Sequence, residues 1–421
     1  MNDLPSSQPS VLTPIDEALS FLLASIAPCC EAEVVALFCA SGRTCASGRI
    51  LSHSITAPLS VPPMANSAMD GYALRAADSV DPERDLAVSQ RIAAGQVGVS
   101  LEPDTAARIF TGAPLPAGAD AVVMQENCER RGEGIRVNKA VAPNENVRPI
   151  GADIKAGSTV FAQGRRLRPQ DIGALASLGL TEVSVTRKLR VALMTTGDEL
   201  QRPGSDLLPG QIYDSNFATL TALLTGLHVD IVDCGRVGDT LAETRDALLD
   251  AAGRADCVIT TGGVSVGEED HVRAAIEQLG TIDLWKLAVK PGKPFAFGKI
   301  TSEGESCQFF GLPGNPVSAF VTFALVVRPA LLALQGATPA SPHSFSVRSG
   351  FFRDKGGPRQ EYLRAVLEQA PEGLVATPLR NQSSGVALSL SRSDGLLIVP
   401  PSVGVTQGEI LQFIPFSELG A

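Results

Sequence analysis

Apolar and polar positions follow two alternating patterns between residues 189 and 337. Short apolar runs typical of strands are interleaved with longer amphipathic stretches typical of helices. The runs are LRVALMTT, HVDIVDCG, DCVITTGG and FFGL, and the stretches are SNFATLTALLTGL, DTLAETRDALLDAAGRA, EEDHVRAAIEQLG and VSAFVTFALVVRPALLAL. LWKLAVK and PFAFGKI bracket a short turn, as the strands of a hairpin do. Strands that alternate with helices predict a doubly wound, mostly parallel α/β domain.

The rest of the chain follows other patterns. Residues 13–56 open with a helical stretch in which Thr13 can act as the cap and Pro14 suits the first position. Residues 57–157 contain short apolar runs with frequent Gly and Pro, which predicts an all-β domain. Residues 158–188 form a linker with one compact helix, PQDIGALASLG, and residues 341–421 have the short strands of a small β-barrel. We therefore predict a multidomain protein of α/β and β parts.

Composition and charge narrow the function classes. The chain has 421 residues, of which 44% are hydrophobic, and this is enough for several cores. Its net charge of −10 argues against nonspecific binding to nucleic acid or to a membrane surface, because both need an excess of Lys and Arg. An anionic ligand must therefore be bound by a local basic cluster or through a metal ion.

Targeting signals and cysteine spacing point to a soluble, cytoplasmic protein. The N-terminal stretch MNDLPSSQPS has no basic residue, unlike a signal peptide. The most apolar stretch, residues 319–335, is interrupted by Arg328 and Pro329 and is shorter than the roughly 20 residues that span a bilayer. Eight scattered cysteines and four histidines show no zinc-ligand spacing, and we expect reduced thiols rather than a disulfide framework.

Three carboxylates follow three of the predicted strands. Glu199 comes after LRVALMTT, Asp239 after HVDIVDCG and Asp270 after DCVITT. Ligands bind at the carboxyl ends of strands in open α/β sheets, and clustered carboxylates there could hold Mg²⁺ together with substrate phosphates. The alternative is that Asp239 and Asp270 only stabilise the first turns of helices.

A glycine-rich loop, GGVSVGEED, lies between a predicted strand and a helix. Gly262, Gly263 and Gly267 would let backbone N–H groups approach a phosphate or another oxyanion, although such a loop can also be a simple tight turn. The loop also spells G-x-S-x-G, with Ser265 in the place of a hydrolase nucleophile. A hydrolase is disfavoured because Glu268 and Glu269 would oppose the negative charge that develops beside the nucleophile.

Lys286, Lys290 and Lys293 are the best candidates for an anion site in this acidic chain. No acidic residue lies among them, and on a strand Lys286 and Lys290 would share a face. The alternative is an edge strand that lysines protect from aggregation. A further loop before a predicted helix contains Pro313 and Pro316, and structure alone explains it adequately.

Eight motifs in one order resemble the molybdopterin molybdenumtransferase family, which includes the C-terminal part of gephyrin. They are NSAMDGYA, RIFTGAPLPAGADAVVMQE, NVRPIGADI, TTGDEL, GQIYDSN, GGVSVGEED, KLAVKPGKPFAFG and GLPGNPVSAF. The resemblance covers nearly the whole chain. The resemblance implies an L-shaped, four-domain protomer in a homodimer, with an inserted β domain, a linker domain, a molybdopterin-binding α/β domain and a C-terminal barrel. It also implies an active cleft between subunits, with Asp70, Thr111 and Asp153 as catalytic residues.

The same resemblance implies the chemistry. Molybdenum from molybdate is inserted into adenylylated molybdopterin, and AMP is released. Glu199, Asp239 and Asp270 would hold Mg²⁺ or shape cleavage of the adenylate, and Lys286 would lie close to the molybdate pocket. The residues implied in binding the substrates are Gly262, Gly263, Ser265, Gly267, Lys290, Lys293, Pro313, Pro316, Arg359 and Ser384, and Ser265, Lys290, Lys293, Arg359 and Ser384 would form the molybdate pocket.

One departure from the family and two alternatives accompany this interpretation. The family often has P-x-F-D before NSAMDGYA, whereas this chain has Pro62-Pro63-Met64-Ala65 there, and the loss of the aromatic and the acid could alter the edge of the cleft. The chain could instead be a molybdopterin adenylyltransferase, although that enzyme needs only the α/β domain, or a catalytically idle molybdopterin-binding scaffold. Contacts with the adenylyltransferase and with molybdoenzyme chaperones are further expectations.

Overall fold

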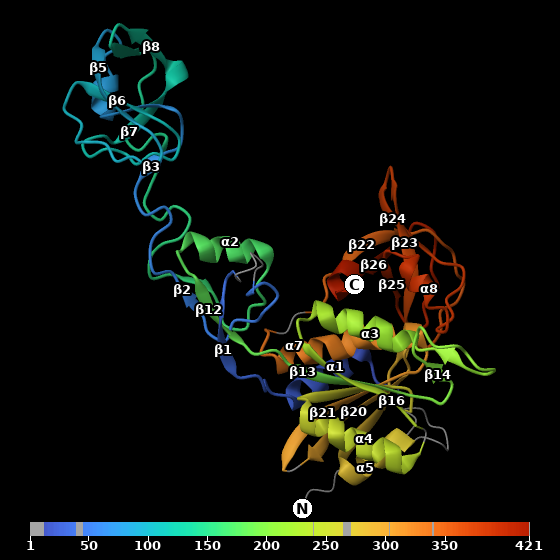
Figure 1. Ribbon diagram of the computed structural model, residues 1–421. Coiled ribbons are helices and arrows are strands. Elements are labelled where there is room, and N and C mark those ends of the chain that lie inside the picture. Colours follow the sequence, from blue (N-terminus) through green and yellow to red (C-terminus); the bar gives the residue numbers. More distant parts are fainter. Residues whose placement is uncertain are drawn as a thin grey trace, which may run out of the picture. The chain divides into compact units, whose positions relative to one another are not determined.

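The computed structural model describes residues 12–38, 45–238, 240–263, 271–302, 304–338 and 341–420 (Figure 1). The chain divides into two compact units. One contains residues 1–33, 48–52 and 184–421, and the other contains residues 34–47 and 53–183. The strands β1 (Ala32–Ala36) and β12 (Glu182–Thr186) belong to the segments where the chain passes from one unit to the other. Each unit is described by itself below.

The smaller unit contains the predicted all-β domain. Its six-stranded sheet has the order β7-β4-β6-β5-β9-β8, formed by Ala121–Met124, Gly71–Leu74, Thr105–Ile109, Asp85–Ile92, Gly134–Val137 and Cys128–Arg131. Two short 3-10 helices, Ala76–Ser79 and Gln125–Asn127, connect these strands. Leu74, Leu86 and Val123 are fully or almost fully buried in its core.

The linker part of this unit is small and contains one α-helix, α2 (Pro169–Ser177), where PQDIGALASLG predicts it. Two antiparallel pairs join distant segments: β2 (Ile55–Thr56) with β11 (Thr159–Phe161), and β3 (Asn66–Ser67) with β10 (Val147–Arg148). The chain therefore leaves the linker, builds the six-stranded domain and returns beside its point of departure.

The larger unit is built on a six-stranded sheet with the order β16-β13-β17-β21-β20-β18. The strands are Asp230–Val237, Arg190–Thr196, Cys257–Thr261, Glu305–Leu312, Pro294–Ser302 and Gly280–Lys286. The first four are mutually parallel, and β20 runs antiparallel to both of its neighbours. This mixed α/β sheet confirms the predicted fold class. A small parallel pair, β14 (Leu200–Gln201) and β15 (Ile212–Tyr213), follows β13.

Helices cover both faces of this sheet, because successive side chains of a buried parallel strand point to opposite faces. On β13, Val191 and Leu193 belong to one core and Ala192 and Met194 to the other. The first core includes α1 (Ile15–Ser25), α3 (Ser215–Gly226) and the long helix after β21. The second includes α4 (Leu241–Arg254) and α5 (His271–Leu279), and Figure 1 shows the two sets on opposite sides.

The helix after β21 runs through Pro329 without a break. It consists of α6 (Pro316–Thr322), a π-helical turn (Phe323–Val327) and α7 (Arg328–Leu334), and the N–H of Arg328 donates to the carbonyl of Phe323. In a regular helix the ring of Pro329 would collide with the carbonyl four residues earlier, and the wider π turn makes room for it. The single helix that VSAFVTFALVVRPALLAL predicts is therefore confirmed, and Arg328 and Pro329 interrupt its apolar pattern without breaking its backbone.

This helix, Pro316–Leu334, is long and apolar enough to cross a membrane, and 83% of its apolar window is buried inside the protein. Such burial is typical of the core helix of an α/β domain. It packs against α1 and α3 and supplies much of the first core.

The C-terminal strands close into a five-stranded barrel. β23 (Gln360–Ala370), β24 (Gly373–Pro378), β22 (Phe345–Ser349), β26 (Ile410–Pro415) and β25 (Gly395–Val399) follow one another, and β25 pairs back with β23. Two short helices, α8 (Leu388–Ser391) and α9 (Phe416–Leu419), complete it. Tyr362, Leu396 and Ile414 of the barrel belong to the same core as α1 and α3, so the barrel and the α/β domain share one apolar core.

The segment between β18 and β20 differs from the predicted hairpin. β18 and β20 do pair as antiparallel strands, with Lys286 opposite Pro294. However, Val289–Lys290 forms a separate strand, β19, which pairs with β23 of the barrel. Lys286 and Lys290 therefore do not share one face of one strand, as the sequence predicts.

Thr13 is likewise not the cap of α1, because the helix begins at Ile15 and Pro14 occupies the cap position. The backbone of Thr13 instead pairs with the same segment: its N–H donates to Lys286 (2.9 Å) and its carbonyl accepts from Ala288 (2.7 Å). Thr240 caps α4 as predicted, since its hydroxyl oxygen accepts the N–H of Glu243.

The cysteines depart from the expectation at one position. Cys29, Cys30, Cys128, Cys234, Cys257 and Cys307 are free thiols, but Cys45 takes part in a disulfide bond. Burial raises the pKa of Cys307 to about 12 and raises that of Cys257 well above its ordinary value. These two thiols therefore stay protonated at neutral pH.

Asp256 lies just before β17 and binds two arginines near the start of the neighbouring strand β13. Its carboxylate is 7% exposed and accepts from the guanidinium of Arg187 (2.7 Å) and from that of Arg190 (2.9 Å). The N–H of Arg190 donates to it as well, at 2.7 Å. Burial raises the pKa of Asp256, but these bonds outweigh it and the pKa lies below its ordinary value.

We predict that Asp256→Asn lowers the free energy of unfolding of the larger unit by about 2 to 3 kcal/mol at neutral pH, because it removes one partner of a buried ion pair. The folded pKa of Asp256 is lowered, so its contribution is present above the unfolded value of about 4 and is lost as the pH falls through the folded value. Urea unfolding at pH 7 and below pH 4 measures both effects.

The matched control is Asp230→Asn, which breaks an exposed pair with Lys188 and should change stability by less than about 0.5 kcal/mol. Equal losses in the two variants, or a difference that does not shrink in acid, would contradict this account of Asp256.

Candidate functional site

The carboxyl edge of the α/β sheet carries the residues that the sequence singles out. Glu199 follows β13 and its side chain is exposed. Asp239 follows β16 and Asp270 comes between β17 and α5, but both lie outside the described residues, as do Ser265 and Gly267. β16, β13 and β17 are neighbours in the sheet, so their loops emerge side by side. Among the described residues, no group of three His, Cys, Asp or Glu is close enough to hold a metal ion.

Gly262 and Gly263 begin the glycine-rich loop in backbone conformations that suit glycine. Their φ angles are +86° and +64°, in the left-handed region. A Cβ on Gly262 would lie 2.9 Å from the carbonyl oxygen of Thr196, at the end of β13. At Gly262 the chain therefore passes too close to the end of β13 for any side chain, and its N–H donates to the carbonyl of Leu312 at 3.1 Å.

The loop before α6 lies against this glycine loop. Pro313 is buried and Pro316 occupies the first turn of α6. A Cβ on Gly314 would lie 3.8 Å from the Cα of Gly262. Asn216, at the start of α3, donates to the carbonyl of Gly314 (2.7 Å) and thereby ties a third loop to the other two.

Asn216 is a site residue that the sequence reasoning did not select. It lies in the GQIYDSN motif, so the signal was present, but the motif alone did not show that the amide bridges two loops.

The segment that contains the three lysines, residues 286–293 (the lysine segment), pairs with a strand of the barrel. Val289 and Lys290 pair with Gln360 and Glu361, and the N–H of Gln360 donates to Ala288 (2.9 Å). The ammonium group of Lys290 lies 3.5 Å from the carboxylate of Glu361. The side chain of Lys290 is 53% exposed while that of Glu361 is only 4% exposed, so the pair joins a half-exposed lysine to a buried carboxylate.

Arg353 balances the buried carboxylate. Its guanidinium donates to Glu361 at 3.0 Å, on the carboxylate oxygen that Lys290 does not contact. One acid therefore lies between two cations, and the group carries a net positive charge. Neither Glu361 nor Arg353 was selected from the sequence, because a single acid and a single arginine in a barrel segment carry no spacing signal.

Lys286 and Lys293 lie at the two ends of this segment. Lys286 ends β18, the edge strand of the sheet, and is half-buried, while Lys293 is exposed. The carbonyl of Lys293 accepts the N–H of Leu287 (2.7 Å), which closes the loop at its base.

Arg359 and Ser384 lie where the barrel meets the α/β domain. Arg359 donates to the carbonyl of Val289 (3.1 Å), the residue before Lys290. The carbonyl of Ser384 accepts the N–H of Val317 in the first turn of α6 (3.0 Å). The structure thus brings Arg359 beside the lysine segment and Ser384 beside the loop that contains Pro313 and Pro316.

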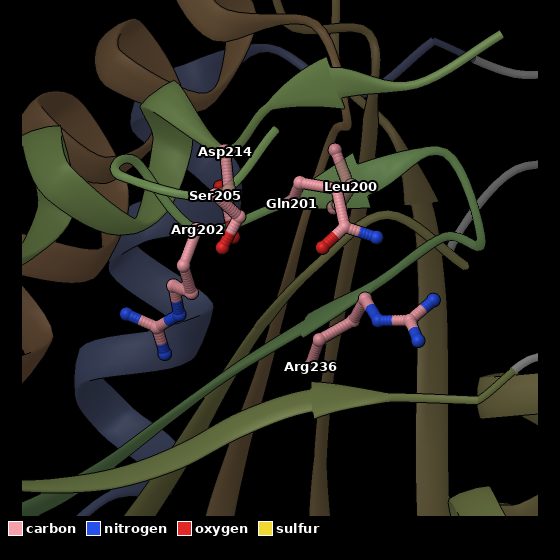
Figure 2. Close-up of a pocket in the computed structure, with 6 residues that line it drawn as sticks. All are labelled: Leu200, Gln201, Arg202, Ser205, Asp214 and Arg236. Carbon is pink, nitrogen blue, oxygen red and sulfur yellow. The ribbon is translucent and has the colours of Figure 1, made fainter. Parts of the chain in front are cut away.

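A cavity of about 140 Å³ opens at the same edge of the sheet (Figure 2). Its lining comes from β14 and the loop after it, from the residue that caps α3 and from the end of β16. The lining residues are Leu200, Gln201, Arg202, Ser205, Asp214 and Arg236. None of these six was selected from the sequence, although Leu200 and Asp214 belong to quoted motifs.

Charges in this cavity are partly compensated. Arg202 pairs with Asp233 (2.7 Å) and stacks on the ring of Phe217, with its guanidinium carbon 3.3 Å from the ring centre. Arg236 pairs with Asp198 at 3.3 Å.

Asp214 is 3% exposed, and one of its oxygens accepts the N–H of Phe217 to cap α3. Its other oxygen is buried without a hydrogen-bond partner, so it can accept from a donor on a ligand.

The smaller unit contains the remaining predicted residues. One oxygen of Asp70 accepts from both the N–H and the hydroxyl of Thr111, each at 2.8 Å. The backbone bond from Thr111, followed by the hydroxyl bond, lowers the pKa of Asp70, which therefore stays ionised at neutral pH. Asp153 is exposed, and its N–H donates to the carbonyl of Val61 (2.9 Å). The structure joins Asp70 and Thr111 into one pair, whereas Asp153 lies in the segment between β10 and β11.

Three family descriptions match successive parts of the chain. Residues 13–179 match the MoeA N-terminal region (domain I and II), residues 192–333 match a probable molybdopterin binding domain, and residues 347–416 match the MoeA C-terminal region (domain IV).

Several relatives match over most of the chain. The molybdopterin molybdenumtransferase of Haemophilus influenzae is 40% identical over 379 residues, which are 89% of this chain and 93% of that protein. The protein of the same name from Bacillus subtilis is 32% identical over 88% of each chain. Among solved structures, the molybdopterin biosynthesis moeA protein of Pyrococcus horikoshii OT3 is 29% identical, has a TM-score of 0.79 and covers 96% of this chain and 100% of its own.

The close approach at Gly262 leads to a prediction. Gly262→Ala should lower the free energy of unfolding by about 2 kcal/mol or more, because the methyl group meets the carbonyl of Thr196 in addition to the cost of the left-handed backbone. Gly408→Ala is the matched control: its φ is +83° and no atom lies within 4 Å of the added Cβ.

The control should lose only the backbone cost of about 1 to 2 kcal/mol. Chemical denaturation of both variants gives the comparison, and a loss no greater in Gly262→Ala than in Gly408→Ala would show that the loop does not need the close contact.

Proposed function

We propose that this chain, which belongs to the MoeA family of molybdopterin molybdenumtransferases, inserts molybdenum from molybdate into adenylylated molybdopterin and releases AMP. It is a transferase of molybdenum-cofactor biosynthesis. The observation that carries the proposal is the assembly of cationic and polar groups where the barrel contacts the α/β domain, in a chain whose net charge is −10. We call this region, which contains β19, Arg359 and Ser384, the seam.

This seam suits an oxyanion substrate. The Lys290 side chain is half-exposed, and Arg359 lies beside its strand through the bond to Val289. Ammonium and guanidinium groups make strong, charge-assisted hydrogen bonds to oxyanions, and a hydroxyl such as that of Ser384 adds a neutral donor. We assign molybdate to Lys290, Lys293, Arg359 and Ser384, with Ser265 of the glycine loop and with Lys286 nearby.

The glycine loop and the cavity suit the rest of the substrate. The N–H of Gly262 donates to the carbonyl of Leu312, so in the described part of the loop it is the backbone of Gly263 that can approach a phosphate where a side chain cannot. The cavity beside β14 offers a carboxylate oxygen of Asp214 without a partner and the arginines Arg202 and Arg236. We assign this cavity to a heterocyclic end of the substrate, whose ring N–H groups match that acceptor.

The carboxylates at the strand ends suit Mg²⁺, since Glu199, Asp239 and Asp270 follow three neighbouring strands and Mg²⁺ prefers oxygen ligands. We propose that these three residues hold the ion. When bound, the ion supplies positive charge to phosphate oxygens.

The smaller unit would act on the same substrate in a homodimer. Asp70 and Thr111 form an exposed pair at one edge of the six-stranded domain, and Asp70 stays ionised. We propose that this pair and Asp153 reach the active cleft of the partner subunit. Cytoplasmic location and contacts with an adenylyltransferase or with molybdoenzyme chaperones belong to the same proposal.

The direct test is AMP release from adenylylated molybdopterin. With Mg²⁺ present, the purified chain should release AMP when micromolar molybdate is added and should release little without it, and Asp239→Ala should be inactive while remaining folded. Chromatography of the nucleotide measures the result. Tight binding of the substrate without AMP release would overturn the transferase and favour an idle cofactor-binding scaffold.

Lys290→Glu should raise the molybdate concentration needed for half-maximal AMP release by about tenfold or more, because it replaces a charge-assisted contact with repulsion. Lys299→Glu is the control, since Lys299 is exposed on β20, away from the seam with the barrel. An unchanged molybdate requirement in Lys290→Glu, or an equal rise in both variants, would move the anion site elsewhere.

A further inference from the structure

Arg364 is the largest fully buried side chain among the described residues, with 1% exposure. It lies on β23, five residues after Arg359. A buried cation is costly unless a carboxylate or another anion compensates it, so buried charges in proteins are usually paired.

The partners of Arg364 are neutral. Its Nε donates to the hydroxyl of Ser389 and its Nη2 to the carbonyl of Ser383, both at 3.1 Å. None of the ion pairs found within the described ranges includes Arg364. Burial lowers its pKa, and no neighbouring acid raises it again. The guanidinium is therefore a buried positive charge without a carboxylate partner in the described part of the chain.

The position of Arg364 links it to the proposed anion site. Tyr362, two residues earlier and on the same face of β23, packs in the core shared with the α/β domain. The backbone of Arg364 exchanges two hydrogen bonds with the side chain of Gln382, at 3.0 and 2.9 Å. Arg364 thus contacts the loop of Gln382 and Ser383 through both its backbone and its side chain. The next residue of that loop is Ser384, whose carbonyl accepts the N–H of Val317 in α6.

We propose that Arg364, beyond its hydrogen bonds to the Ser384 loop, acts on the molybdate site through its buried positive charge, for which a bound oxyanion is the counter-charge. This inference rests on the proposed function, because the oxyanion is the molybdate assigned to Ser384 and Arg359. In the low-dielectric interior the field of an uncompensated charge extends further than in water, so Arg364 acts on the anion without touching it.

A purely structural role predicts something different. If Arg364 only held the loop, a lysine would be as poor a substitute as glutamine, since neither reproduces the forked hydrogen bonds to Ser389 and Ser383. If the charge matters, Arg364→Lys should retain most of the molybdate affinity and Arg364→Gln should lose it.

The experiment measures the shift in the thermal unfolding midpoint on adding molybdate alone, together with AMP release at varied molybdate. Arg364→Gln should lose most of the molybdate-induced shift and raise the half-saturating molybdate concentration about tenfold, while AMP release at saturating molybdate stays within about threefold of the original. Arg364→Lys should stay within about threefold in both measurements. Arg348→Gln is the matched control, because Arg348 also donates to two backbone carbonyls in the barrel but is half-buried and away from the Ser384 loop.

The outcomes separate this inference from the proposed function. If the unchanged chain shows neither a molybdate-induced shift nor AMP release, the proposed function fails and the inference fails with it. If the unchanged chain shows both, and Arg364→Gln shifts as much as Arg348→Gln does, only the inference is overturned. If Arg364→Gln does not fold, Ser389→Ala replaces it: this variant removes a hydrogen bond and keeps the charge, so a tenfold loss of molybdate affinity in Ser389→Ala would overturn the inference.

Discussion

The pairing of β19 with β23 is the interaction on which the candidate site depends. It takes two residues of the lysine segment out of the α/β sheet and makes them an outer strand of the barrel. Lys290 then faces Glu361, and Arg359 contacts the carbonyl of Val289, so groups far apart in the sequence become neighbours. Without this pairing, Lys290 would lie in the connection between β18 and β20, with no contact that brings it beside Glu361.

The apolar core that the barrel shares with the α/β domain stabilises the pairing of β19 with β23. Tyr362, Leu396 and Ile414 of the barrel pack with the helices of the α/β domain, so the two domains cannot separate without exposing apolar surface. The polar groups at the seam are therefore fixed before any ligand arrives, and preorganised charges bind an oxyanion with little loss of side-chain freedom. In the proposed site, a bound anion would compensate the buried charge of Arg364, whose partners within the described residues are neutral.

Much of the fold follows from the sequence pattern, but the pairing at the seam does not. Because side chains of a strand alternate between its two faces, the sequence of β13 already places Val191 and Leu193 on one face of the sheet and Ala192 and Met194 on the other. The spacing of Thr240 and Glu243 likewise indicates where α4 begins. β19 has only two residues, which are too few to show the alternation typical of a strand, and its sequence does not indicate which sheet it joins. Asn216, Glu361 and Arg364 were missed for a related reason, since their roles come from contacts between segments and not from spacing within one.

The account depends most directly on where the oxyanion binds. Crystals of the full chain soaked with tungstate, an isostere of molybdate, would locate the metal by anomalous scattering. We expect a strong peak within hydrogen-bond reach of Lys290, Arg359 and Ser384, at the seam between the barrel and the α/β domain. A peak elsewhere, with this seam empty at the same tungstate concentration, would contradict the account.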